Sequence, residues 1–326
     1  MMTLNQPWGE ALGARHDFYH LPGYHSLAER RGEGAARLFV HKEGGYSVAL
    51  PLLLRPLDGG LQDATSVYGY AGPAASHEEA PRAVLENFRA ALRETLAGLR
   101  VVTVFSRLHP LLRQREIVAG LGDCVAGGNT ISIDLTLPEE AQRAQFRSDH
   151  KRGINKARRA GMTVAEGAEH LDAFIEIYTE TMRRVNAAGH YFFDRAYFEE
   201  LMALGDVRLF AALSGGEVTA GALLFTCNGI VQYHLGGTRG KYLELAPMKL
   251  VFETVRLWAM EQGHTVFHLG GGVGSREDSL FHFKAGFSDR RHPFFTWRWV
   301  IDQEACDALC AGKAGGAAGF FPPYRA

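Results

Sequence analysis

Long apolar runs are missing from this sequence of 326 residues. No stretch reaches the roughly 18 apolar residues that a helix needs to cross a bilayer. The first residues, MMTLNQPWGEALGARHDFYH, also lack the apolar core of a secretory signal peptide. We therefore expect no transmembrane segment and a cytoplasmic location, with peripheral contact to a membrane still open.

Cysteine is scarce as well, with Cys124, Cys227, Cys306 and Cys310 only. The spacing of Cys306 and Cys310 suits two successive turns of a helix. No second cysteine pair with nearby histidines supports a zinc site. The sequence predicts free thiols and no metal.

The net charge is only -1, so binding of phosphate groups requires a local patch of positive charge. The segment RSDHKRGINKARR provides one, because Asp149 is its only acid. On a helix, Lys151 and Arg158 could share a face with His150, and a second face would group three further cations. Such a patch suits a phosphate-rich partner, whereas the ordinary explanation is a solvated helix. The cations are Arg147, Lys151, Arg152, Lys156, Arg158 and Arg159.

Two segments far apart in the sequence repeat one pattern. ARLFVHKEGGYSVALPLLLR (36–55) and VRLFAALSGGEVTAGALLFT (207–226) each predict a β-hairpin around a Gly-Gly turn. SVYGYAGP (66–73) then corresponds in position to VQYHLGGT (231–238), and TVFSRLHP (103–110) to TVFHLGGG (265–272). Helical patterns at 78–99 and 246–263 lie between these pairs. Each half reads helix, hairpin, strand, helix, strand, which predicts an α/β fold.

The two halves join near residues 138–164, so we expect domains at 1–145 and 146–326. Pro138, Glu139 and Glu140 suit the first turn of a helix, and a further helix is expected at about 172–186. The small-residue tail AGKAGGAAGFFPPYRA is expected to be a linker. Its aromatic end would pack back on the first domain.

The stretch FHLGGGVGSREDSLFHFKAGFS (267–288) has the most distinctive pattern. A strand leads into Gly270–Gly272, and a helix capped by Asp278 then ends at Lys284-Ala285-Gly286-Phe287. A lysine before a terminating glycine is typical of a helix C-terminus. The glycines could let backbone amides approach an anion, or simply form a tight loop.

This last segment resembles the helix that ends in Gly-Phe in GNAT acyltransferases. Two such domains in one chain resemble the FemAB family, whose members transfer amino acids from aminoacyl-tRNA to peptidoglycan precursors. The likeness extends over about residues 35–300. It is carried by HKRGINKARRAGMTV (150–164), TETMRRVNAAGHYFF (179–193) and SLFHFKAGFS (279–288).

The resemblance implies two tandem GNAT-like domains with mixed, mostly antiparallel sheets flanked by helices. Two departures from the family stand out. The long helical arm of FemA-type members is missing from the pattern. In addition, GTRGKYLELAPMK (237–249) matches the GNAT coenzyme A loop only at Arg239-Gly240, which disfavours acetyl-CoA without excluding it.

The resemblance also implies roles for single residues. Lys284 matches the FemAB lysine that stabilises an oxyanion or a phosphate. His282 lies where GNAT enzymes often have a tyrosine acid, but residues 282 and 284 are about 200° apart on a helix, so Lys284 is preferred. Arg184 matches a position that binds the precursor's diphosphate, and a helix C-terminal arginine is the ordinary alternative. Lys151 and Arg152 would contact tRNA or the pyrophosphate of a lipid-linked precursor.

Four residues at predicted strand ends could contact substrate beside a domain cleft. They are Tyr68 and Tyr70 in DATSVYGYAGP, Arg107 in SRLHP, and Tyr233 in the second half. His109 and His234 occupy comparable places. Burial of the aromatic rings in the core is the ordinary explanation for any one of them.

The sequence thus predicts an N-acyltransferase that moves an aminoacyl group from tRNA to an amine of a peptidoglycan precursor, UDP-linked or lipid-linked, or of another cell-envelope molecule. Aminoacyl-tRNA would be the donor, with no further cofactor and no DNA partner. Acetyl-CoA-dependent N-acetyl transfer to a small amine is one alternative. A non-catalytic GNAT pair that binds anions or RNA is the other.

Overall fold

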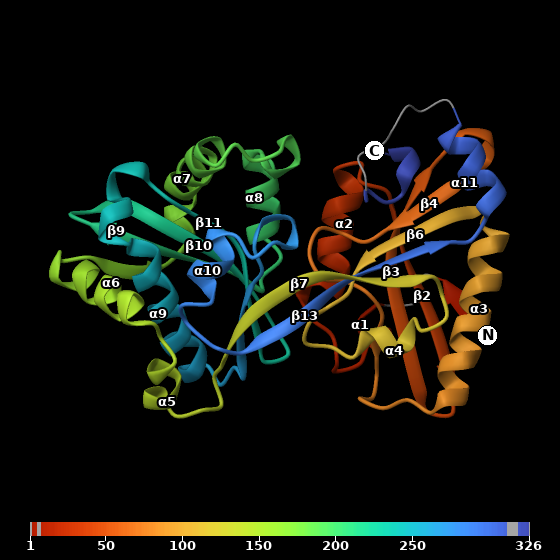
Figure 1. The fold of residues 1–326 in the computed structure, drawn as a ribbon, viewed down its shortest axis with the longest axis horizontal. Coiled ribbons are helices and arrows are strands. Elements are labelled where there is room, and N and C mark those ends of the chain that lie inside the picture. Colours follow the sequence, from red (N-terminus) through yellow and green to blue (C-terminus); the bar gives the residue numbers. More distant parts are fainter. Residues whose placement is uncertain (1, 5–7, 312–318, 326) are drawn as a thin grey trace. The chain divides into compact units, whose positions relative to one another are not determined.

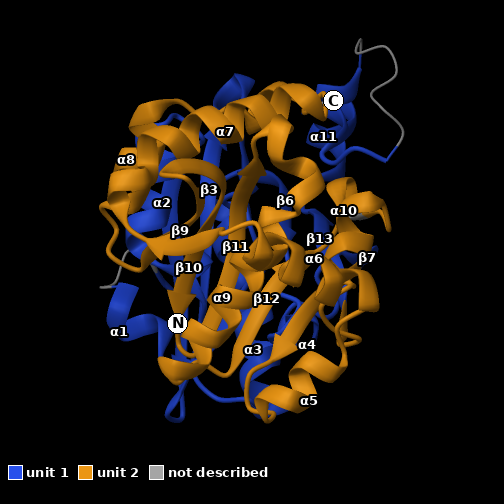
Figure 2. Cartoon of the chain, turned by 90° about the vertical axis from the view of Figure 1, so that its left-hand side faces the viewer, with its two compact units in different colours: residues 1–128, 293–326 blue, residues 129–292 orange. Residues whose placement is uncertain are grey.

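The computed structural model describes residues 2–4, 8–311 and 319–325. The chain forms two compact units, residues 1–128 with 293–326 and residues 129–292 (Figure 2). It passes from one unit to the other within strand β7 (Asp123–Asp134) and returns within strand β13 (Arg291–Val300). The boundary near residue 145, drawn from the sequence repeat, stays a prediction.

Unit 1 is built on a sheet (Figure 1). Within its described residues, β4 pairs with β6 in parallel, and the pairs β1–β2, β2–β3, β3–β4, β3–β5 and β6–β13 are antiparallel. The strand order is β1 (Met2–Leu4), β2 (Ala35–Glu43), β3 (Tyr46–Pro56), β4 (Gln62–Thr65), β6 (Val101–Arg107) and β13, with β5 (Ala74–Ala75) on β3. Its helices are α1 (Trp8–Leu12), α2 (Pro22–Arg30), α3 (Arg82–Gly98), α4 (Gln114–Ile117) and α11 (Gln303–Cys310).

Unit 2 repeats this plan: among its described strands, β11 pairs with β12 in parallel, and the pairs β7–β12, β10–β11, β9–β10 and β8–β9 are antiparallel. The strand order is β7, β12 (Val266–Gly270), β11 (Ile230–Thr238), β10 (Glu217–Cys227), β9 (Val207–Ser214) and β8 (Thr163–Glu166). Its helices are α5 (Glu139–Ala144), α6 (Ser148–Arg159), α7 (Leu171–Arg184), α8 (Arg195–Met202), α9 (Pro247–Glu261) and α10 (Ser279–Lys284).

Both predicted hairpins are present, and their turns have the same geometry. Gly44 and Gly45 have φ of 56° and 84°, while Gly215 and Gly216 have 56° and 86°. Positive φ at both central residues is the requirement of the type I′ turn, which only glycine meets without strain. The predicted fold class, mixed and mostly antiparallel sheets flanked by helices, is confirmed.

The sequence predicts a strand at residues 66–73 that corresponds to residues 231–238, and this prediction is wrong for residues 66–73. Residues 231–238 lie in β11, whereas β4 ends at Thr65 and the following residues form bends. Gly69 has φ of 121°, and a Cβ there would lie 2.1 Å from Cε1 of Tyr19. The segment therefore leaves the sheet to fold around the Tyr19 ring.

In unit 2, alternate strand residues separate two covered faces. Phe267 and Leu269 of β12 join Ile131 of β7 and Phe252 of α9 in one buried apolar cluster that also includes Ile154 of α6. Helix α7 packs against β10 and β11, with Ile177 in a separate cluster. The two faces follow from the period of two in each strand.

The aromatic end of the chain lies in unit 1. Tyr324 is buried with Val102 and Cys306, and its hydroxyl lies 2.6 Å from Oγ1 of Thr103. Residues 312–318 of the expected linker lie outside the described residues. In the part of the chain that the structure describes, no helix combines the length and the apolar character of a membrane span.

Candidate functional site in unit 2

Strands β11 and β12 run side by side for three residues and then separate. Their pairing extends from Ile230 and Val266 to Gln232 and His268. Gly270 of β12 instead pairs with Ile131 of β7, while β11 continues to Thr238. The register of β10 with β11 also shifts here, because Leu223 faces Leu235 and Leu224 faces Tyr233, which leaves His234 as an extra residue. This divergence produces an opening in the parallel pair at Tyr233.

Lys284 lies at this opening. It is the last residue of α10, and only 5% of it is exposed. Its Nζ donates a hydrogen bond of 2.6 Å to the carbonyl oxygen of Gly271, just beyond β12. The same nitrogen lies 5.3 Å from the ring centroid of Tyr233. The structure therefore brings Lys284 and Tyr233 together.

Burial sets the electrostatics of this pair. It lowers the pKa of Lys284 to about 7, and the negative charge of Asp278 acts in the opposite direction. Burial also raises the pKa of the Tyr233 phenol. An amine with a pKa near neutrality can exchange a proton with substrate or meet a developing negative charge as a cation. A solvated lysine at a helix terminus would stay protonated at neutral pH and could not accept a proton, but Lys284 is not solvated.

The glycine loop is shaped by Asp278. One carboxylate oxygen accepts from the Phe281 backbone N–H at 2.9 Å and caps α10, as predicted. The other accepts from the Val273 N–H at 3.0 Å. A Cβ on Gly272 would lie 2.3 Å from this carboxylate. In this loop it is the Gly271 carbonyl, rather than an amide, that meets the Lys284 side chain.

Gly286 does not have the left-handed conformation that is common for a glycine after a helix. Ala285 follows α10 in a right-handed conformation, and Gly286 is not among the glycines with positive φ. A Cβ at Gly286 would lie 2.1 Å from Cε1 of His150. Glycine is required at this position because the imidazole of His150 occupies the space of a side chain.

His150 therefore does not share a surface with the cations around it, contrary to expectation. With Ile154 and Ala157 it forms the buried face of α6. Its Nε2 lies 2.8 Å from the carbonyl oxygen of Phe283, and its Nδ1 lies 3.0 Å from Oδ2 of Asp149. Asp149 also accepts from Nζ of Lys249 on α9 at 2.9 Å.

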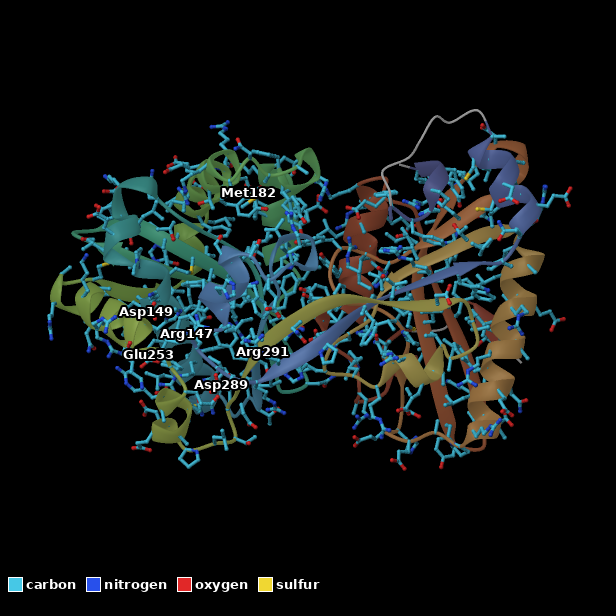
Figure 3. All side chains as sticks on the ribbon, in the orientation of Figure 1. Arg147, Asp149, Met182, Glu253, Asp289 and Arg291 are labelled. Atoms are coloured by element: carbon cyan, nitrogen blue, oxygen red, sulfur yellow. The ribbon has the colours of Figure 1, made fainter. Side chains whose placement is uncertain are left out.

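The outer face of α6 carries the positive charge, as expected for Arg152, Lys156 and Arg159, which are exposed. Some cations are committed to the protein itself. Lys151 donates to the Ala144 carbonyl at 3.3 Å and Lys156 to the Glu244 carbonyl at 2.8 Å. Figure 3 labels Arg147 and Asp149 at the start of this helix.

Arg184 fastens the loop after β11. It donates to the Thr238 carbonyl at 3.0 Å and lies 3.6 Å from Glu180. Glu180 in turn accepts from the Gly240 N–H at 2.6 Å. Thr238 is five residues beyond Tyr233 on β11, or roughly 16 Å at strand spacing. Arg184 and the Lys284–Tyr233 pair therefore lie at different places along one strand.

The remaining predicted residues are elsewhere. His282 is exposed on α10. It precedes Phe283, whose carbonyl oxygen contacts His150. Tyr68, Tyr70 and Arg107 belong to unit 1. Tyr70 makes edge contacts with Tyr19 and other rings, and the Arg107 guanidinium lies 5.4 Å from the Phe105 ring.

Sequence reasoning missed the carbonyl that binds Lys284 and the imidazole that packs beside Gly286. A backbone carbonyl such as that of Gly271 has no sequence signal. His150 had one, since it repeats at the spacing of the apolar residues Ile154 and Ala157. The chain Thr130–His268–Gln232, with hydrogen bonds of 2.8 and 2.6 Å across three strands, was also missed.

Residues 144–284 match the model of the Acetyltransferase (GNAT) domain. No curated protein sequence matches the chain. Among solved structures, FemX has a TM-score of 0.75 at 14% identity, covering 94% of this chain and 99% of its own. The C-terminal domain (DUF2156) of a candidate lysylphosphatidylglycerol synthetase from Agrobacterium fabrum has 0.56 at 15% identity, with coverages of 93% and 95%.

L-PGS from Bacillus licheniformis has a TM-score of 0.55 at 17% identity, covering 90% of this chain and 94% of its own. These likenesses confirm the expected FemAB-like tandem GNAT fold. The GNAT domain match confirms the expected enzyme class, an acyltransferase, and it includes both His150 and Lys284.

Proposed function

We propose, from the FemAB-like tandem GNAT fold, that this protein transfers an aminoacyl group from aminoacyl-tRNA to an amine of a cell-envelope molecule. The observation that carries the proposal is the buried Lys284 amine at the opening between β11 and β12. The names of two relatives, FemX and a candidate lysylphosphatidylglycerol synthetase, support the envelope as the setting.

In this reaction the neutral amine of the acceptor attacks the ester carbonyl carbon of the donor. The new C–N bond forms as the C–O bond to the tRNA ribose breaks, and the amine proton passes to the leaving oxygen. As a cation, Lys284 would donate to the tetrahedral oxyanion. Exchange of its bond to Gly271 for a bond to the oxyanion keeps the buried ammonium hydrogen-bonded throughout.

The loop after β11 favours tRNA over coenzyme A as donor. The resemblance places the coenzyme A loop at residues 237–249, where only Arg239-Gly240 matches. In this chain the Gly240 amide donates to Glu180, and Arg239 pairs with Glu176 and with Glu217, each at 3.4 Å. A diphosphate there would meet three carboxylates and would need to displace one of them.

The outer face of α6 supplies the positive charge that a tRNA donor requires. Lys151 and Arg152 would contact donor phosphates, in a protein whose overall net charge is only -1. Arg184 at the far end of β11 would contact a phosphate of the acceptor. Tyr68, Tyr70 and Arg107 would bind substrate from unit 1. The reaction would take place in the cytoplasm, where aminoacyl-tRNA is made.

The test is a transfer assay with purified protein, aminoacyl-tRNA labelled in the amino acid, and two acceptors in parallel. Acetyl-CoA labelled in the acetyl group replaces aminoacyl-tRNA in a second set of reactions. One acceptor is UDP-N-acetylmuramyl-pentapeptide, which offers an amine. The other is a vesicle that contains phosphatidylglycerol, which offers a hydroxyl group and tests whether this protein shares the acceptor named for the lysylphosphatidylglycerol synthetase. Label in the nucleotide acceptor supports the proposal. Transfer only from acetyl-CoA would replace tRNA as the donor, and no transfer by any donor would favour a non-catalytic binding protein.

Glu180→Gln separates the two donors further. It removes a negative charge beside the Gly240 amide while keeping a hydrogen-bond acceptor. If tRNA is the donor, transfer changes less than about twofold. If coenzyme A binds here, its affinity rises by about the 0.5–1 kcal/mol typical of an exposed charge.

A further inference from the structure

His150 joins the basic helix α6 to the segment that carries Lys284. Its Nε2 lies 2.8 Å from the Phe283 carbonyl, which belongs to the residue immediately before Lys284. A carbonyl only accepts, so Nε2 carries the proton of this bond. The hydrogen bond fixes the main chain at the end of α10 from outside that helix.

Further contacts hold the same turn. The His150 ring fills the space beside Gly286, and it makes an edge contact with the Phe287 ring at 4.6 Å between centroids. The Arg147 backbone N–H, at the start of α6, donates to the Gly286 carbonyl at 2.9 Å. The turn from Phe283 to Phe287 is therefore clamped by the first turn of α6.

A carboxylate anchored to α9 lies on the other side of the imidazole. Oδ2 of Asp149 accepts from Lys249 on α9 at 2.9 Å and lies 3.0 Å from Nδ1 of His150, which can donate to it only when the ring carries a second proton. The hydrogen bond from Lys249 lowers the pKa of Asp149 to about 2, so this carboxylate is ionised at neutral pH. Helices α6, α9 and α10 thus meet at one imidazole, directly under the cations of α6.

We propose that His150 is a positioning residue for Lys284, which places the Lys284 amine at Gly271 through the Phe283 carbonyl and the contact with Gly286. The inference rests on the proposed function and deepens it, because the helix whose outer face would contact donor phosphates also sets the place of the Lys284 amine that would stabilise the oxyanion. A single helix, α6, would then both contact the donor and fix the position of Lys284.

The matched pair His150→Asn and His150→Gln tests the proposal. The asparagine amide reaches the position of Nδ1 and loses the bond to Phe283. The glutamine amide reaches the position of Nε2 and keeps that bond. The chain has seven lysines, so lysine labelled with ¹³C at Cε gives a spectrum in which Lys284→Met assigns the one signal of interest.

We expect His150→Asn to raise the titration midpoint of the Lys284 signal by about one pH unit or more. An amine that moves away from its buried position is solvated again, which raises its pKa. We expect kcat to fall about tenfold or more with KM for the donor unchanged. His150→Gln should retain the wild-type midpoint and most of kcat. A wild-type midpoint in His150→Asn, or equal effects of both variants, would overturn the proposal.

The spectrum needs no substrate, so it decides the proposal even if the transfer assay fails. A thermal melt of each variant reports whether it is folded. If His150→Asn does not fold, His150→Leu takes its place, since leucine occupies space beside Gly286 and offers no donor to the Phe283 carbonyl. A wild-type Lys284 midpoint in folded His150→Leu would likewise reject the role of the clamp.

Discussion

The Lys284 amine and the Gly271 carbonyl oxygen are joined by a hydrogen bond of 2.6 Å. This contact connects the last residue of α10 to the residue that follows β12, across the glycine loop between them. It gives a buried amine one fixed acceptor where the two parallel strands separate. The first two predictions concern this amine.

Lys284→Met should leave the protein folded and reduce transfer by about a hundredfold or more, because one oxyanion donor typically contributes that much. Methionine fills a similar volume and carries no charge. Transfer rates and thermal melts of the variant give the two readouts. Lys284→Arg is the control for charge, since a guanidinium keeps the cation but changes its shape. Full activity in Lys284→Met would remove this residue from the mechanism.

Lys284 should also make stability depend on pH. Its pKa is about 7 in the folded protein and 10.5 as its ordinary value. Between these values the unfolded chain binds a proton that the folded chain does not. The free energy of unfolding therefore rises with pH in this window, by up to about 1.4 kcal/mol per pH unit.

Urea unfolding at pH 7.5, 8.5 and 9.5 checks this slope. The Lys284→Met variant is the reference, because its slope lacks the contribution of this amine. Two parallel lines for the two proteins would mean that the amine keeps its ordinary pKa.

Gly286→Ala should destabilise the protein by about 1–3 kcal/mol, because the new Cβ would lie 2.1 Å from the His150 ring. Gly98→Ala is the matched control at the end of another helix. Gly98 ends α3 and has no atom within 4 Å of an added Cβ, so alanine should stabilise by ~0.5–1 kcal/mol. Equal effects in chemical denaturation would contradict the packing explanation for Gly286.

Asp278→Ala removes the cap of α10 and the bond to Val273, and it should cost at least about 1 kcal/mol. It should also lower the pKa of Lys284 further, since the Asp278 charge raises that pKa. Asp302→Ala removes a comparable cap, from the Ala305 N–H of α11 in unit 1. Both variants should lose stability, and only Asp278→Ala should shift the pH profile of transfer.

The repeat in the sequence shows how much could be read without coordinates. The hairpins and the helices after them follow from apolar periodicity and Gly-Gly turns, which are local properties. Val118-Ala119-Gly120-Leu121 follows α4 as Lys284-Ala285-Gly286-Phe287 ends α10, so the same local pattern occurs twice. Only the second copy has a lysine. The local pattern gives that lysine no catalytic role, and its role was predicted only from the family resemblance.

The sequence alone determined the two hairpins, the helices at 78–99 and 246–263, and the cap at Asp278, while a family resemblance pointed to Lys284. These features depend on neighbours in the chain, whose spacing is printed in the sequence. Only the tertiary structure decided that Lys284 is buried against Gly271, that Gly286 makes room for His150, and that Arg184 holds the Thr238 carbonyl. Each of these contacts joins residues from separate elements, and the packing of helices on a sheet brings such residues together without leaving a pattern in either segment.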